Sequence, residues 1–193
     1  KLPCSVINNG IDTDVFKPSS INCHIGGKFK ILGVASEWTP RKGLHDFIQL
    51  YRMLNHEQIE MIIVGLTSQQ IEALPEGIRG MTRTDNIEQL VSLYQEADMF
   101  FNPTYEDNYP TTNLEALACG TPVCTYRTGG SIESVNEGNG FVVEKNELGG
   151  VKKIIEERLH SRKMGLHLDI DRKRISKEYM AEQYIKLYND ILL

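Results

Sequence analysis

Two cations and a glycine follow a pair of residues that is typical of a helix start. Thr39 suits an N-cap and Pro40 suits the first helical position, so the sequence predicts that Arg41 and Lys42 lie in the first turn. The N-terminal end of a helix carries partial positive charge, so cations there are unfavourable unless an anion lies between them and the free backbone amides. The segment therefore favours a diphosphate site, and two solvated surface charges are the alternative.

A second segment, Tyr105–Val123, places acidic side chains before and inside another predicted helix. Glu115 follows Thr112 at the spacing of a capping box, so its carboxylate could simply fold back onto its own helix end. Alternatively, Glu115 accepts hydroxyls of a ribose while Asp107 holds sugar hydroxyls, because an ionised carboxylate accepts strong hydrogen bonds from a vicinal diol. Both interpretations remain open from these residues alone.

A third segment contains two adjacent glycines, Gly129 and Gly130, after a predicted strand. Glycines at such a place let the backbone approach a ligand closely. A plain turn between a strand and a helix is the alternative.

These segments lie among short apolar runs that alternate with helical patterns, which indicates a doubly wound, Rossmann-like α/β domain with a parallel sheet. In such a sheet, ligands bind at the carboxyl ends of the strands, here after Ala35, Gly65, Met81, Asn102 and Tyr126. The expected strands are Ser5–Asn8, Phe29–Ala35, Glu60–Gly65, Ile78–Met81, Met99–Asn102, Pro122–Tyr126 and Gly140–Val143. The expected helices are Pro40–Leu54, Ser68–Ala73, Asn86–Ala97, Thr112–Cys119, Ser131–Asn136, Glu147–Leu159 and Ser176–Leu192.

Composition limits the function further. The chain has 193 residues, 40% of them hydrophobic, which suits one domain with a real core. Its net charge of -5 argues against a nucleic-acid partner, because such binding needs a basic surface. The four cysteines and five histidines show no metal-site or disulfide spacing, and we expect reduced thiols, no metal and a cytoplasmic location. The dinucleotide fingerprint and the P-loop motif are both missing.

The three segments together resemble retaining glycosyltransferases of the GT-B fold, the group called family 4. The matching pieces come in order: the N-G-I-D segment at 9–12, Lys42-Gly43, the helix end at 93–98, the run Leu114–Val123, Thr128–Gly130 and the stretch 138–141. The resemblance implies that the chain is the C-terminal, donor-binding domain, and that an N-terminal domain with acceptor contacts precedes it. Residues 1–20 would then enter from that domain, and residues 176–193 would form a terminal helix that packs partly against it.

The resemblance also implies roles for individual residues. Lys42 would bind the diphosphate of a UDP- or GDP-sugar, Glu115 the ribose, and Asp107 the sugar, without metal or cofactor, and the loop 80–83 would lie along the base. Further donor contacts would come from Arg41, Gly43, Thr82, Arg83, Asn108, Tyr109, Pro110, Thr111, Thr112, Gly129 and Gly130. The acceptor would be a glycan or a lipid-linked sugar in polysaccharide synthesis.

Two departures from the family pattern keep alternatives open. Glu37 occupies the place of the first phosphate-binding arginine, and Asp107-Asn-Tyr-Pro110 replaces the usual E-G-F-G stretch. These departures suit a non-catalytic nucleotide-sugar-binding module, which is one competing hypothesis. The other is a different GT-B enzyme, such as an epimerase or a phosphorylase. A basic cluster suggests either a solvated helical face or peripheral contact with an anionic membrane; it comprises Arg158, Arg162, Lys163, Arg172, Lys173, Arg174 and Lys177.

Overall fold

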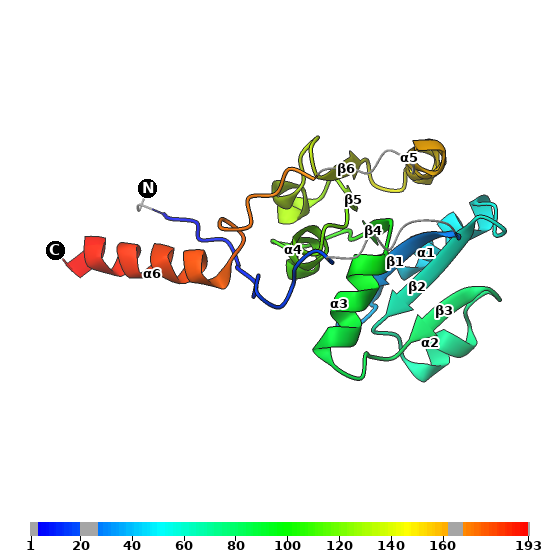
Figure 1. Ribbon diagram of the computed structural model, residues 1–193, viewed down its shortest axis with the longest axis horizontal. Coiled ribbons are helices and arrows are strands. Elements are labelled where there is room, and N and C mark those ends of the chain that lie inside the picture. Colours follow the sequence, from blue (N-terminus) through cyan, green and yellow to red (C-terminus); the bar gives the residue numbers. More distant parts are fainter. Residues whose placement is uncertain (1–3, 20–26, 162–167, 193) are drawn as a thin grey trace.

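The computed structural model describes residues 4–19, 27–161 and 168–192, and within them the chain forms one six-stranded sheet. All neighbouring strands are parallel, in the order β3-β2-β1-β4-β5-β6 (Figure 1). The strands are β1 (Phe29–Val34), β2 (Ile59–Val64), β3 (Ile78–Met81), β4 (Met99–Asn102), β5 (Val123–Tyr126) and β6 (Gly140–Val143). The predicted doubly wound α/β fold is confirmed.

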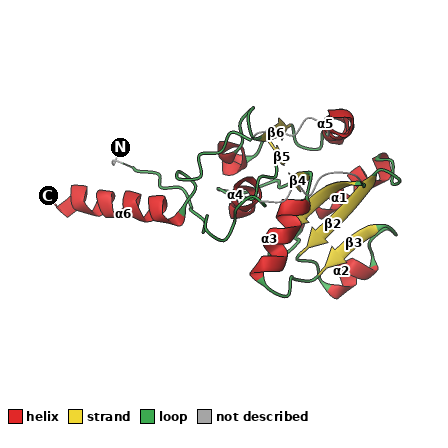
Figure 2. Cartoon of the chain, in the orientation of Figure 1, coloured by secondary structure: helices red, strands yellow, loops and turns green. Residues whose placement is uncertain are grey.

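Helices follow the strands and, apart from the last one, cover both faces of the sheet (Figure 2). They are α1 (Leu44–Met53), α2 (Ser68–Glu72), α3 (Ile87–Glu96), α4 (Thr111–Ala118), α5 (Leu148–Ser161) and α6 (Lys177–Leu192), with short 3-10 helices η1 (Pro40–Lys42) and η2 (Gly129–Ser134). None of the helices in the described ranges is long and apolar enough to cross a bilayer.

Alternate residues of each strand enter opposite halves of the core. Ile31 of β1 packs in a cluster with Phe47 of α1, whereas the next residue, Leu32, packs in a cluster with Tyr94 of α3 and Leu114 of α4. Side chains of a strand alternate between the two faces, so a strand covered on both faces must be apolar throughout. This explains why the strands appear in the sequence as mostly apolar runs, with charged residues only near the start of β1 and β2, at Lys30 and Glu60, and in the edge strand β3, at Arg79.

Three predicted elements differ from the structure. Ser5–Asn8 is not a strand; the only pairing of this segment within the described residues is a bridge between Ile11 and Ser176. The helix expected from Pro40 is divided, because Gly43 has a left-handed φ of 76° that ends η1 before α1 begins. The helix expected at Ser131–Asn136 is the 3-10 helix η2.

The terminal segments lie side by side outside the sheet. The carbonyl of Ile11 accepts a bond from the Lys177 amide, and α6 then extends away from the domain beside the N-terminal segment (Figure 1). The Arg172 guanidinium joins the N-terminal segment to the end of α4, because it donates hydrogen bonds to the carbonyls of Thr13, Phe16 and Ala118. Arg172 is thus a structural residue, while Arg162 and Lys163 of the basic cluster lie outside the described residues.

A buried network of polar side chains joins the second half of the sheet to α4. The Asn102 amide at the end of β4 donates to Asn113 of α4 over 2.8 Å, and Asn113 in turn donates to Ser131 and Ser134 of η2. Thr125 of β5 donates to the Asn102 carbonyl over 2.9 Å. The network fixes the N-terminal half of α4 relative to the ends of β4 and β5.

We predict that Asn113→Ala lowers the free energy of unfolding by about 1–3 kcal/mol, because it leaves buried donors and acceptors unpaired. Thermal unfolding measures the change, and each kcal/mol corresponds to about 2–4 °C in a chain of this size. Asn189→Ala, on the exposed surface of α6, is the matched control and should be nearly neutral. Equal melting temperatures for the two variants would show that the network does not support the fold.

Candidate functional site

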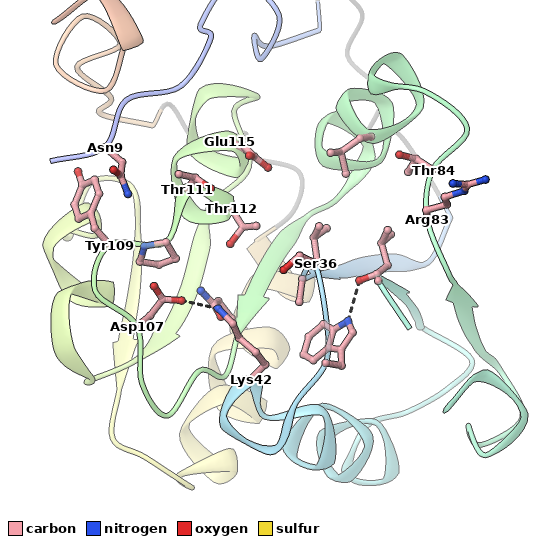
Figure 3. A pocket seen from close by; sticks show the side chains of 18 of the residues that line it. Asn9, Ser36, Lys42, Arg83, Thr84, Asp107, Tyr109, Thr111, Thr112 and Glu115 are labelled. Atoms are coloured by element: carbon pink, nitrogen blue, oxygen red, sulfur yellow. Dashed lines mark hydrogen bonds and ion pairs between the residues drawn. The ribbon is translucent and has the colours of Figure 1, made fainter. Parts of the chain in front are cut away.

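A cavity of about 540 Å³ opens at the carboxyl ends of β3, β2, β1 and β4. The strand order reverses between β1 and β4, and ligands of doubly wound sheets bind at such a switch point. The volume is that of an ordinary small-molecule site. The walls come from the strand ends, the loop before α4, the first turns of α4 and the N-terminal segment (Figure 3).

Lys42 and Asp107 meet inside this cavity. Lys42 ends η1, and its Nζ lies 2.7 Å from Oδ2 of Asp107 in the loop between β4 and α4. Figure 3 shows the two side chains joined across the cavity. They are only 24% and 16% exposed, so the pair is partly removed from water. The site therefore holds an ammonium group whose charge is already balanced by a carboxylate of the neighbouring loop.

The close approach of two loops places these residues together. At Gly43, a Cβ atom would lie 2.2 Å from the Pro103 carbonyl oxygen, so only glycine lets the turn after Lys42 touch the loop after β4. The Tyr105 amide then donates to the Arg41 carbonyl over 2.7 Å. The Arg41 side chain itself is exposed and does not line the cavity, and Lys42 lies in η1 rather than in the first turn of α1.

Glu115 reaches the cavity from α4. This helix begins at Thr111 with Pro110 as its N-cap and has no side-chain cap, so the capping-box interpretation of Thr112 and Glu115 is wrong. Oε2 of Glu115 instead accepts a hydrogen bond from the Tyr94 hydroxyl over 2.8 Å. Burial raises the pKa of Glu115, and the hydrogen bond from Tyr94 opposes part of that rise.

The remaining predicted residues divide into two groups. Those that line the cavity, beside Lys42, Asp107 and Glu115, are Thr82, Arg83, Tyr109, Pro110, Thr111 and Thr112. Those outside its lining are Arg41, Gly43, Asn108, Gly129 and Gly130.

The two glycines after β5 serve the loop rather than the cavity. At Gly129, a Cβ atom would lie 2.3 Å from the Asp107 carbonyl oxygen. At Gly130, it would lie 1.4 Å from the Asn108 carbonyl oxygen. The Gly130 amide also donates to the Asp107 carbonyl over 3.0 Å. The expected close approach is therefore real, but what approaches is the backbone of the acidic loop.

The structure adds wall residues that the sequence did not single out. Ser36 and Thr84 follow β1 and β3, where the fold predicts ligand contacts, so their position after a strand was the available signal. Asn9 comes from the N-terminal segment; it belongs to the N-G-I-D piece of the family resemblance, to which the sequence assigns no role in the site.

For Trp38, the sequence leaves open stacking on a ligand or packing in the core against the first helix. The ring lines the cavity, packs edge-on against Phe47 of α1, and donates from Nε1 to the Val64 carbonyl over 2.8 Å, which fixes it in the core.

No group of three or more His, Cys, Asp or Glu side chains in the described part of the chain is arranged to hold a metal ion. The polar groups of the lining are the Lys42 ammonium, balanced by Asp107, the Arg83 guanidinium, and the Glu115 carboxylate. Hydroxyls of threonine, serine and tyrosine and the amides of Asn9 and Asn102 complete the set.

The raised pKa of Glu115 predicts a pH-dependent cost to stability. Because the folded-state pKa lies above that of the unfolded chain, stability is fully present at low pH and is lost as pH rises through the folded-state pKa. We expect Glu115→Gln, which still accepts from Tyr94, to melt above the wild type at pH 7, by about 2–4 °C per kcal/mol recovered. The difference should vanish at acidic pH, and the exposed control Glu57→Gln should show none. A variant that melts below the wild type at pH 7 would contradict this account.

Solved structures with the same fold include a complex and an isolated domain. The Anabaena protein HepE in complex with UDP-glucose superposes with a TM-score of 0.79 at 20% identity, over 96% of this chain and 57% of that one. The C-terminal domain of a group 1 glycosyl transferase, LpcC from Francisella tularensis, gives a TM-score of 0.66 at 18% identity, over 91% and 98% of the two chains.

Sequence relatives include a capsular polysaccharide biosynthesis glycosyltransferase, CapM of Staphylococcus aureus, which is 22% identical over 84% of this chain and 46% of its own length. Another is the D-inositol 3-phosphate glycosyltransferase of Corynebacterium jeikeium, 27% identical over 96% of this chain and 51% of its own length. The chain thus spans about half the length of these relatives.

The family profile described as "Glycosyl transferases group 1" matches residues 22–178, which is most of the chain. The fold agrees with that match, because the superposition on the isolated C-terminal domain covers nearly all of both chains. The chain belongs to the group 1 glycosyltransferases and has the fold of their C-terminal, GT-B domain.

Proposed function

We propose that this chain is the donor-binding half of a retaining glycosyltransferase that takes its sugar from a nucleotide-diphosphate sugar. The observation that carries the proposal is that Lys42 and Glu115, from opposite sides of the sheet's switch point, line one cavity. A cation for a diphosphate and a carboxylate for a ribose are the two groups that such a donor requires. In this cavity, Asp107 lies within hydrogen-bonding distance of the cation.

The proposal gives each part of the donor its own part of the cavity. The diphosphate would lie between Lys42 and the first amides of α4, where the helix end favours an anion. The ribose would bind Glu115, and the base would lie along Thr82–Thr84 at the end of β3. The sugar would then face Asp107, Tyr109 and Asn9.

Catalysis would rest on stabilising the departing diphosphate. Preorganised positive charge at the place where negative charge develops is a large source of rate enhancement. Lys42 and the α4 amides would supply that charge without a metal ion or cofactor. Asp107 would release Lys42 to the phosphate when the donor arrives and would then accept a hydroxyl of the sugar.

The relatives suggest which donor and acceptor the whole enzyme would use, and acceptor binding would need a second domain. The solved HepE structure holds UDP-glucose, and CapM is named for capsular polysaccharide biosynthesis. By analogy, the donor would be a UDP- or GDP-sugar, and the acceptor a glycan or lipid-linked sugar at the cytoplasmic side of a membrane. Exposed apolar residues of α6, including Ile185 and Leu192, would pack against an N-terminal acceptor domain.

A non-catalytic nucleotide-sugar-binding module is the second candidate. It is favoured by Glu37, which stands where the family has an arginine and is exposed outside the cavity lining. Arg41 does not replace that arginine, because its side chain is exposed outside the lining, and the other cation that the described residues bring to the cavity is Arg83, after β3. An epimerase would share the same donor site and would differ in its products.

We predict that the chain binds UDP or GDP in a calorimetric titration. Lys42→Ala and Glu115→Ala should each weaken binding about tenfold or more, because each removes a hydrogen bond to a charged group. Lys153→Ala, on the exposed face of α5, is the control and should bind as the wild type does. Wild-type binding that survives both cavity substitutions would refute the assignment of the site.

Asp107→Asn should have opposite effects on binding and on transfer. Removing the carboxylate frees Lys42, so UDP should bind about two- to fivefold more tightly, the worth of a partly exposed ion pair. Transfer from the UDP-sugar by the full-length enzyme should fall sharply, because the sugar hydroxyl then donates to a neutral amide oxygen instead of an ionised carboxylate. Equal loss of UDP binding and transfer would show that Asp107 does not compete for Lys42.

The same transfer assay separates the alternative functions. A binding-only module would show no transfer in the wild type, and an epimerase would convert its donor without an acceptor.

A further inference from the structure

A buried carboxylate lies outside the cavity, on the first turn of α1. Asp46 is 5% exposed, and its Oδ2 accepts hydrogen bonds from the hydroxyls of Tyr105 over 2.6 Å and Tyr126 over 2.8 Å. None of these three residues lines the cavity. A buried carboxylate is costly unless it is hydrogen-bonded, and the start of a helix favours its negative charge.

The Asp46–Tyr105 bond joins the same two segments as the Lys42–Asp107 ion pair. Asp46 follows Lys42 by four residues, and Tyr105 precedes Asp107 by two. Between these two contacts, the Tyr105 amide donates to the Arg41 carbonyl over 2.7 Å. The Thr104 hydroxyl makes a longer bond to the same carbonyl, over 3.4 Å. The loop after β4 is thus attached to η1 through the Arg41 carbonyl and to α1 through the Tyr105 side chain, both close to the ion pair.

The ion pair needs such support. A partly exposed pair formed by a long lysine side chain gains little free energy, because it must restrict several rotatable bonds. On its other side, the loop is held by η2 and the residue before it: the Gly130 amide donates to Asp107, and the Thr128 hydroxyl donates to the Thr104 carbonyl over 2.9 Å. Without the bond to Asp46, the loop would keep its attachment to η2 and lose its side-chain attachment to α1.

We propose that Tyr105 and Asp46 act as positioning residues that hold Asp107 against Lys42 and so set the charge presented to the ligand. For its effect on ligand binding, this proposal rests on the proposed donor site. The Tyr105 hydroxyl stays protonated and able to donate throughout the neutral range, because burial and the bond to Asp46 raise its pKa to about 12.

The chain offers a matched control. Tyr126 donates to the same oxygen of Asp46, but it lies on β5 and is not part of the acidic loop. Tyr105→Phe and Tyr126→Phe each remove one hydroxyl from the same carboxylate and keep the ring. The Tyr105 hydroxyl also contacts Asn146, so Asn146→Ala tests that contact separately.

The first experiment follows amide hydrogen exchange in the ligand-free chain. The reporters are the amides at positions 105 and 130, which donate to Arg41 and Asp107. Tyr105→Phe should speed exchange at both about five- to tenfold, the factor that corresponds to one hydrogen bond, relative to Tyr126→Phe and Asn146→Ala. Equal exchange in all three variants, after correction for their melting temperatures, would overturn the proposal.

The second experiment measures UDP affinity in two backgrounds. Tyr105→Phe should tighten UDP binding in the same direction as Asp107→Asn but by less, because it partly frees Lys42. In the Asp107→Asn background it should have no further effect. An equal effect in both backgrounds would show that Tyr105 does not act through Asp107. If the wild type fails to bind UDP, the proposed donor site is wrong, and the exchange result still decides whether Tyr105 positions the loop.

Discussion

The contact between the loop after β4 and the turn after Lys42 is the constraint on which the site depends. At Gly43 there is no room for a side chain beside the Pro103 carbonyl, and at Gly130 there is none beside that of Asn108. These close approaches come from segments far apart in the sequence, and they fix the backbone of the acidic loop from both sides. The Lys42–Asp107 ion pair follows from that backbone arrangement rather than causing it.

The sheet explains why these segments meet. The chain builds β1, β2 and β3 outward in one direction and then returns to place β4 on the other side of β1. The loops after β1 and β4 therefore leave the sheet next to one another with no helix between them, and the cavity forms there. Helix α4 begins at the edge of this cavity, and the buried network of Asn102 and Asn113 fixes its first turns.

The polar groups of the site carry free-energy costs that the surrounding structure offsets. Glu115 is partly buried, with a pKa raised by that burial, and Tyr94 supplies the hydrogen bond that limits the cost. Asp46 is buried with two tyrosine donors and the start of a helix beside it. The carboxylates and the ammonium of the cavity are already partly dehydrated, so a polar ligand can replace their internal hydrogen bonds with bonds of its own.

The sequence by itself determined the layered fold, because strands that are buried on both faces must be apolar throughout and helices must alternate with them. It also indicated Lys42, Asp107 and Glu115 as ligand-binding residues. A cation at the start of a helix is unfavourable without an anion, and carboxylates around the start of the next helix can accept hydroxyls. It could not determine what Gly129 and Gly130 approach, whether Glu115 caps its own helix, or that Arg41 lies outside the cavity lining while Asn9 belongs to it. These outcomes depend on contacts between segments distant in sequence, and such contacts leave no periodic pattern in either segment; only the folded backbone decides them.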